Sequence, residues 1–177
     1  MSVFMRWYSH NLKRHPLAMN MVTTGSVFCL GDILSQQLVE EKGKDHDLER
    51  TGRSVAVGSL YSTPIVVFLY NLVDQVFGRT QTPLNTIKKI GLLAVFSPLT
   101  NSGFILCNNM LRSKPLDYTM TQIAEDVPRI VLTGYMIWFP THFFLFTVIP
   151  LRHRVFFSNF VSVLWTCYLT NVSNART

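Results

Sequence analysis

Hydrophobic residues in this chain are grouped into long stretches that charged residues do not interrupt. No Asp, Glu, Lys or Arg occurs in five intervals: 15–31, 54–73, 90–111, 130–151 and 155–175. A helix needs about 20 mostly apolar residues to cross the hydrocarbon core of a bilayer. The middle three intervals meet that length. The first meets it if its helix continues past Asp32 to about residue 39.

These stretches predict an all-α fold, a polytopic transmembrane helix bundle that forms one integral-membrane domain over 1–177. We expect four spans and a C-terminal membrane-associated helix, at about 17–39, 54–77, 86–111, 130–149 and, for the last, 155–170. The last helix is not counted as a span, because its tail is polar. The alternative is a soluble bundle of buried helices. It would have to explain why so few positions on any helix face carry a charge, since a surface helix has one polar face.

Polar segments separate the predicted helices. In 40–53, nine of fourteen residues are charged, which predicts a charged, solvated loop. Residues 112–129 predict a polar connection that has room for a short interfacial helix. Residues 1–14 contain basic residues and no acidic one, and Trp7 and Tyr8 suit an anchor at the level of the headgroups.

Composition supports the membrane interpretation. Hydrophobic residues make up 48% of the chain and charged residues 15%, against about 25% charged in ordinary soluble domains. The formal net charge is +6, but the cations stand in ones and twos at segment ends, as at a lipid interface. We therefore expect the lipid bilayer as a partner and no direct binding of nucleic acid.

Motifs for catalysis or metal binding are not found in the sequence. The three cysteines lie in three different apolar segments, with no CxxC pair or Cys/His cluster. The glycine-rich loops and nucleophile motifs of common enzymes are missing as well. We therefore expect no enzyme activity, no metal and no cofactor.

The first predicted helix carries polar residues on one face. Gly25, Cys29, Asp32 and Gln36 follow the spacing i, i+4, i+7 and i+11, which places them on one side of a helix. Asp32 lies eight residues before Glu40, about 12 Å from the charged end of the helix. An ionised Asp at a membrane helix centre costs roughly 2.5–3.5 kcal/mol. We expect this face to contact other helices or water rather than lipid.

Other spans contribute polar side chains that could meet Asp32 and Gln36. They are Tyr70, Asn71 and Asp74 in the second span, Asn101 and Asn108 in the third, and His142 in the fourth. Two interpretations remain open. The side chains could join helices by hydrogen bonds of about 1 kcal/mol each, or they could line a hydrated path whose selectivity they set.

Several motifs along nearly the whole chain resemble those of one protein family. The first segment has His15–Pro16 and then Gly31–Asp32 followed by two glutamines, and the second has Arg53, Pro64, Tyr70 and Asp74 at the family's spacing. Near the end, the family signature is matched by Trp138, Pro150, Arg154, Trp165 and Tyr168. The chain is identified on these motifs as similar to the Mpv-seventeen and twenty-two-kilodalton peroxisomal membrane protein family. It departs from the pattern at Leu92–Leu93, where the family has an Asp-Gln pair, and at His142, where it has Gln.

The resemblance implies a small multi-pass protein of the mitochondrial inner membrane, with the peroxisomal membrane as the alternative. It also implies weakly selective channel activity that contributes to membrane-potential, reactive-oxygen and mitochondrial DNA or nucleotide homeostasis. Our leading hypothesis is a pore for small solutes or ions, with Asp32 and Asp74 in its wall. The alternative is a non-conducting scaffold that binds partner membrane proteins or lipids; assembly into a homo-oligomer is compatible with either.

Overall fold

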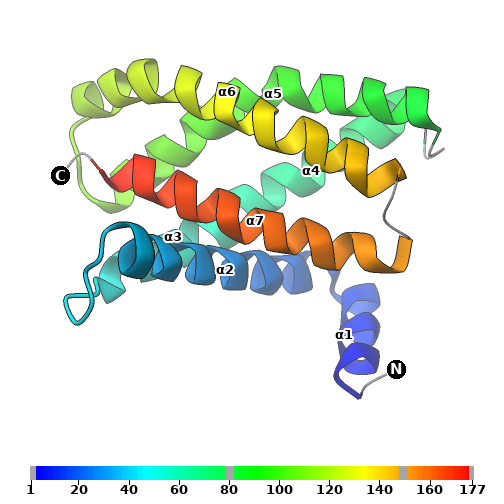
Figure 1. Ribbon diagram of the computed structural model, residues 1–177, viewed down its shortest axis with the longest axis horizontal. Helices are drawn as coiled ribbons and strands as arrows, with labels where there is room; N and C mark the ends of the chain where they lie inside the picture. Colours follow the sequence, from blue (N-terminus) through cyan, green and yellow to red (C-terminus); the bar gives the residue numbers. More distant parts are fainter. Residues whose placement is uncertain (1–2, 79–81, 148–150, 176–177) are drawn as a thin grey trace.

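The computed structural model describes residues 3–78, 82–147 and 151–175, and every regular element in these ranges is a helix (Figure 1). Two π-helical segments, η1 (Ser35–Val39) and η2 (Gly58–Ser62), extend or join α-helices. The α-helices are α1 (Val3–Arg14), α2 (Pro16–Leu34), α3 (Leu48–Val57), α4 (Thr63–Phe77), α5 (Pro83–Leu111), α6 (Leu116–Thr147) and α7 (Leu151–Asn174).

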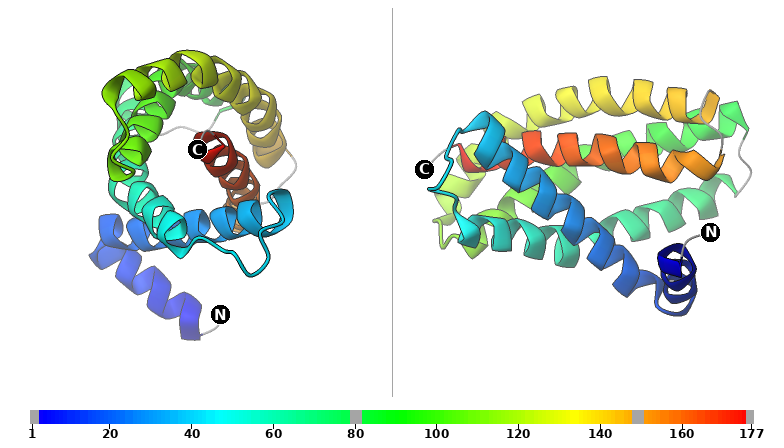
Figure 2. Two further views of the ribbon diagram at one scale, coloured as in Figure 1. Left: turned by 90° about the vertical axis from the view of Figure 1, so that its left-hand side faces the viewer. Right: turned by 60° about the horizontal axis from the view of Figure 1, so that its bottom comes forward.

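The helices from α2 to α7 are arranged as a ring when the bundle is viewed from its end (Figure 2). Helix α7 packs along α2 and α6, and α5 packs along α6. The turn between α5 and α6 and the last residues of α7 lie at the same end of the bundle as the segment between α2 and α3 (Figure 1). The start of α2, the end of α4 and the start of α5 lie at the opposite end (Figure 1).

Three helical stretches within the described residues are long and apolar enough to cross a membrane. They are Pro16–Val39, Leu48–Phe77 and Pro83–Leu111, which contain the first three predicted spans. The predicted fourth span, 130–149, corresponds to the second half of α6, and its last residues lie outside the described ranges. The predicted C-terminal helix, 155–170, lies within α7.

The predicted charged loop at 40–53 is wrong for its second half, because α3 begins at Leu48. The Asp47 carboxylate accepts a hydrogen bond from the backbone N–H of Arg50 at 2.8 Å, and Glu49 lies in the first turn. An acidic N-cap and an acidic first turn both stabilise the start of a helix. The charges that predicted a loop therefore include the signals that begin a helix.

The predicted polar connection at 112–129 is also much shorter than expected, because α6 begins at Leu116. Thr119, Gln122 and Asp126 are buried and stand at i, i+3 and i+7. They share one helix face, but this face is polar. A search for hydrophobic periodicity therefore does not find this part of the helix.

Small residues allow α2 to approach its neighbours closely. A Cβ atom added to Gly31 would lie 2.6 Å from Cβ of Thr166 on α7, and one added to Gly58 would lie 2.5 Å from the ring of Phe28. Such distances are shorter than any ordinary carbon contact. The central core includes Phe28, Phe104 and Leu169.

Candidate functional site

Asp32 is the centre of a buried charge cluster. Its side chain has no exposed surface, and Nε of Arg50 donates to its Oδ1 at 2.9 Å. Its Oδ2 accepts from Nε2 of Gln36 and from Oγ1 of Thr51, both at 2.8 Å. A buried carboxylate is stable only with a counter-charge and hydrogen bonds. Asp32 has both, from α3 and from its own helix.

Arg50 extends the cluster to other elements. Its Nη1 donates to Oε2 of Glu40 at 2.7 Å, and its Nη2 donates to Oγ of Ser35 at 3.1 Å. The backbone carbonyl of Thr170, on α7, lies 3.5 Å from Nη2. One guanidinium therefore joins α2, η1, α3 and α7. The name charge cluster refers below to Asp32, Ser35, Gln36, Glu40, Arg50 and Thr51.

Gln36 fixes the chain where it enters α3. Its Oε1 accepts from the backbone N–H of Asp47 at 2.7 Å, and its Nε2 also donates to the backbone carbonyl of Asp47 at 3.0 Å. The side-chain amide thus pairs with the backbone of the α3 N-cap residue. Together with the bond to Asp32, this pairing ties the end of α2 to the start of α3.

Glu40 stands at the outer edge of the cluster and is ionised through most of the pH range. Its partial burial opposes ionisation, but hydrogen bonding to Arg50 and the charge of Arg50, with contributions from Lys42 and Ser35, outweigh that effect. They lower the pKa of the Glu40 carboxyl from 4.5 to about 2.

A second polar cluster lies at the same end of the bundle, between α5, α6 and α7. Nδ2 of Asn108 donates to Oγ of Ser173 at 2.7 Å, and Nδ2 of Asn109 donates to Oε1 of Gln122 at 2.9 Å. Nε2 of Gln122 then donates to the backbone carbonyl of Ser173 at 3.2 Å. This amide cluster, made of Asn108, Asn109, Gln122 and Ser173, is buried like the charge cluster.

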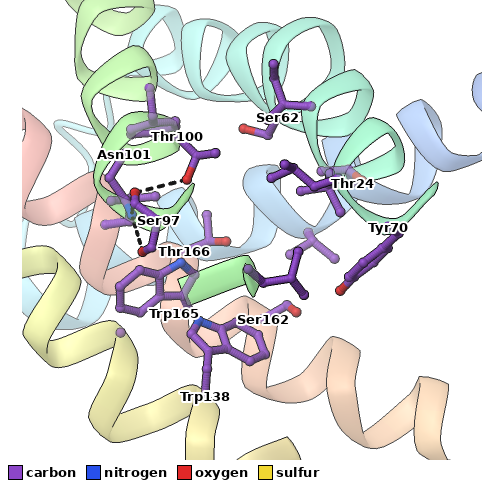
Figure 3. A pocket seen from close by; sticks show the side chains of 18 of the residues that line it. Thr24, Ser62, Tyr70, Ser97, Thr100, Asn101, Trp138, Ser162, Trp165 and Thr166 are labelled. Carbon is purple, nitrogen blue, oxygen red and sulfur yellow. Dashed lines mark hydrogen bonds between the residues drawn. The ribbon is translucent and has the colours of Figure 1, made fainter. Parts of the chain in front are cut away.

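The other half of the bundle holds a pocket of about 410 Å³ between α2, η2, α4, α5, α6 and α7 (Figure 3). None of the described residues that line it is Asp, Glu, Lys or Arg. The lining contains polar, aromatic and aliphatic side chains. The lining includes Thr23, Thr24, Ser62, Tyr70, Ser97, Thr100, Asn101, Trp138, His142, Ser162, Trp165 and Thr166. The pocket therefore offers uncharged hydrogen-bonding groups and aromatic surfaces.

The short polar side chains of the pocket bond mainly within their own helices. Nδ2 of Asn101 donates to the carbonyl of Ser97 at 2.8 Å. The dashed lines in Figure 3 mark hydrogen bonds among Ser97, Thr100 and Asn101. Nδ1 of His142 lies 2.6 Å from the carbonyl of Trp138. Two tyrosines cross between helices instead: Tyr61 donates to Thr100 and Tyr135 to Ala94, both on α5.

The pocket borders on the central core and not on the charge cluster. Phe28 and Phe104 belong to that core and also line the pocket, with ring centroids 5.7 Å apart. No residue of the charge cluster lines the pocket.

The predicted site residues divide between these regions instead of meeting around one cavity. The pocket contains Tyr70, Asn101, Trp138, His142 and Trp165; the charge cluster contains Asp32 and Gln36; the amide cluster contains Asn108. Asp74 forms an ion pair with Lys89, and Asn71 is exposed. The structure therefore does not place Asp32 and Asp74 in the wall of one path, because each carboxylate lies against a cation on a different pair of helices.

The remaining signature residues have structural contacts or lie outside the described ranges. Gly31 provides the close contact of α2 with α7, and Oη of Tyr168 donates to Oγ1 of Thr133 on α6 at 3.2 Å. Pro150 lies outside the described residues. Arg154 is in α7, and its side chain lies outside the described part.

Sequence reasoning missed Arg50 and Thr51, which lie in the segment predicted as a loop. A buried acid needs a cation, and Arg50 is buried, with 4% of its surface exposed. That requirement is the signal that could have directed the search to 40–53. Arg53, which carries part of the family resemblance, pairs with Glu49 near the surface instead.

Within the described residues, no group of three or more His, Cys, Asp or Glu side chains is placed to hold a metal ion. The polar groups of both halves are instead arranged for hydrogen bonding.

Comparisons with known proteins identify the family. The model of the Mpv17 / PMP22 family matches residues 109–170. "Mitochondrial inner membrane protein Mpv17" of Xenopus laevis is 30% identical over 170 residues, covering 96% of this chain and 96% of the relative. The human protein of the same name is 30% identical over 167 residues, covering 93% of this chain and 94% of the relative.

A fungal relative gives the same result, since "Protein SYM1" of Kluyveromyces lactis is 30% identical over 176 residues, covering 96% of this chain and 89% of the relative. No solved structure matches the chain significantly. The relatives match along nearly the whole chain, and three of its helices are suited to spanning a membrane. The chain belongs to the Mpv17 / PMP22 family and is a multi-pass protein of the mitochondrial inner membrane.

Proposed function

We propose that this protein is a solute-permeation protein of the inner membrane and that the pocket is the wide part of its path. The observation that carries this proposal is the uncharged, polar-lined cavity of about 410 Å³ inside a bundle whose helices can span the bilayer. Selectivity in membrane paths follows from the width and the hydrogen-bonding groups of the lining. The proposal includes four spans, with the second half of α6 as the fourth and α7 as the membrane-associated helix.

The lining favours neutral or weakly charged solutes. An ion that enters an uncharged cavity loses hydration without gaining a counter-charge, which is costly. A small polar molecule can instead replace its water with contacts to hydroxyls, amides and the indole rings of Trp138 and Trp165. We therefore propose that permeation of uncharged hydrogen-bonding solutes exceeds that of ions.

The proposed path is closed at the end of the bundle that holds the charge cluster and the amide cluster. We call this the closed end. The side chains of the two clusters form hydrogen bonds between α2, α3 and α7 and between α5, α6 and α7. Passage of a solute would require these hydrogen bonds to rearrange. Such a gated permeability would let the protein contribute to membrane-potential, reactive-oxygen and nucleotide homeostasis without any catalytic chemistry, so we propose that it is not an enzyme.

The test is solute flux in vesicles that contain the purified full-length protein. Glycerol and erythritol should equilibrate faster than in protein-free vesicles, and lactate and potassium should lag behind them. Thr24→Trp would fill the α2 side of the pocket and should reduce flux at least several-fold. Thr24→Val should retain the flux, because valine has about the same size as the threonine that it replaces. Flux and conductance equal to those of protein-free vesicles, at every potential and pH applied, would contradict the proposal.

The second candidate function is a non-conducting scaffold for partner membrane proteins. The favouring observation is that both carboxylate oxygens of Asp32 are fully engaged by protein groups and that Asp32 lies away from the pocket. Asp32 is then a residue that stabilises the fold and does not contact a solute. In that case Asp32→Asn would lower thermal stability and the yield of co-purified partners, and no pocket substitution would change flux.

A further inference from the structure

Helix α1 leaves the bundle sideways because of the sequence at its end. His15 precedes Pro16, and a residue before proline avoids the helical conformation. His15 accordingly has φ of −135° and ψ of 66°, so α1 ends there and α2 begins in a new direction. Both Figure 1 and Figure 2 show α1 running across the long direction of the bundle. Since α2 is suited to spanning the bilayer, a bundle whose long direction follows the membrane normal would have α1 along the membrane plane where α2 enters it.

The exposed face of α1 is basic. The helix contains Arg6, Lys13 and Arg14 and no acidic residue, and the first acidic residue of the whole chain is Asp32. Arg6, His10 and Arg14 follow each other at intervals of four, so they share one side of the helix, and all three are exposed. The side chain of Trp7 is also 55% exposed.

We propose that α1 is a surface helix that binds the headgroups of anionic phospholipids through Arg6 and Arg14. A helix in the membrane plane with basic residues and an aromatic ring is attracted to anionic lipids and anchored at the headgroup level. Each arginine near such a surface adds to binding, and no acid on α1 opposes it. The partner is therefore a negatively charged bilayer surface, because its charge is complementary to that of the basic helix.

Contact with α2 links this surface helix to the pocket. Oη of Tyr8 lies 3.0 Å from Oγ1 of Thr23, and Thr23 is one of the residues that line the pocket. Tyr8 and Leu12 are half-buried, whereas the basic face is exposed. Lipid bound to α1 would therefore act directly beside the α2 wall of the pocket.

Hydrogen exchange of the full-length protein in lipid nanodiscs tests the proposal. The amides of α1 should exchange about tenfold more slowly in phosphatidylcholine with roughly one-third phosphatidylglycerol than in phosphatidylcholine alone. The double variant R6Q/R14Q should lose this difference, whereas R6K/R14K should keep it because the charge remains. The matched control K44Q, at an exposed lysine at the other end of the bundle, should also keep it.

Three results would overturn the proposal. One is equal exchange of α1 in the two lipid compositions. The second is a difference that persists in R6Q/R14Q while the amides of α5 show that this variant is folded. The third is the same protection in pure phosphatidylcholine after addition of inorganic phosphate, which would identify a site for free anions instead of a bilayer surface. None of these results depends on solute flux.

Discussion

The two halves of this bundle differ in how their short polar side chains form hydrogen bonds, although Tyr61 and Tyr135 of the pocket also bond across to α5. In the charge cluster, hydrogen bonds join residues far apart in sequence, such as Arg50 with Asp32 and with the carbonyl of Thr170. In the pocket, Asn101 and His142 bond to the preceding turn of their own helices. A bond between helices fixes their separation, whereas a bond within one helix leaves the helix free to move relative to its neighbours.

This difference indicates where the bundle is rigid. Both carboxylate oxygens of Asp32 are hydrogen-bonded, and a satisfied buried network of this kind rigidifies a structure. The end that holds the charge cluster should therefore keep the helices together while the pocket end adapts to its contents.

Arg50→Ala should have the largest effect on stability. It leaves Asp32 buried without its counter-charge, and such a loss costs about 3–5 kcal/mol. Thermal or denaturant unfolding in detergent measures the change. Lys44→Ala, at an exposed position in the segment before α3, is the matched control and should stay within about 0.5 kcal/mol of the wild type.

Combining Arg50→Ala with Asp32→Asn tests whether the loss of stability comes from the charge of Asp32. If the cost comes from the uncompensated charge, the double variant Asp32→Asn/Arg50→Ala should lose less stability than the two single variants added together. Additive losses would mean that Arg50 acts through packing alone, and the contrast between the two halves would then not rest on charge.

Gly31→Ala should be the next most harmful substitution. The added Cβ would lie 2.6 Å from Cβ of Thr166 and 3.0 Å from the backbone nitrogen of Cys167, so α2 and α7 would have to separate. Overpacking of this kind costs about 1–3 kcal/mol. Gly91→Ala is the control, because its Cβ would meet nothing within 4 Å and should instead stabilise α5 by about 0.5–1 kcal/mol. Equal effects at the two glycines would show that the close contact of α2 with α7 is not needed.

The sequence allowed prediction where one local rule decided the outcome. Length and absence of charge located three stretches that the structure shows as apolar helices, and the spacing of Asp32 and Gln36 placed them on one face, where the structure joins them by a 2.8 Å bond. The helix start at Leu48 was not predicted, because charge density was interpreted as exposure although Arg50 is directed inward.

The partners of the polar residues could not be predicted for a related reason. Spacing tells which residues share a helix face, but not which helices are neighbours. Asp74 was therefore proposed for the same pore wall as Asp32, whereas in the structure it contacts Lys89. The pocket was also hidden, since its lining is spread over α2, η2, α4, α5, α6 and α7, and spacing does not tell which faces of these helices meet.

Acidification should weaken the closed end by a smaller amount through Glu40. The pKa of the Glu40 carboxyl falls from its ordinary value of 4.5 in the unfolded chain to about 2 in the folded protein, so folding favours the ionised form. The stabilisation is fully present above pH 4.5 and is lost as the pH falls toward 2. After allowance for solvent screening it amounts to about 1–2 kcal/mol. Unfolding of the wild type and of Glu40→Gln should therefore differ at neutral pH and converge near pH 2; a difference that stays constant would contradict this assignment.

Asn101→Ala should have the smallest effect on stability, although it changes the pocket most directly. Its amide bonds to Ser97 on the same helix, and loss of a local, partly buried bond of this kind costs about 0.5–1 kcal/mol. Flux of glycerol should nevertheless change several-fold, because the variant removes an amide from the lining. Asn108→Ala is the matched comparison at the closed end: its amide bonds to Ser173 on another helix, so it should cost more stability. The opposite order of the two asparagines would mean that the pocket, and not the closed end, holds the helices together.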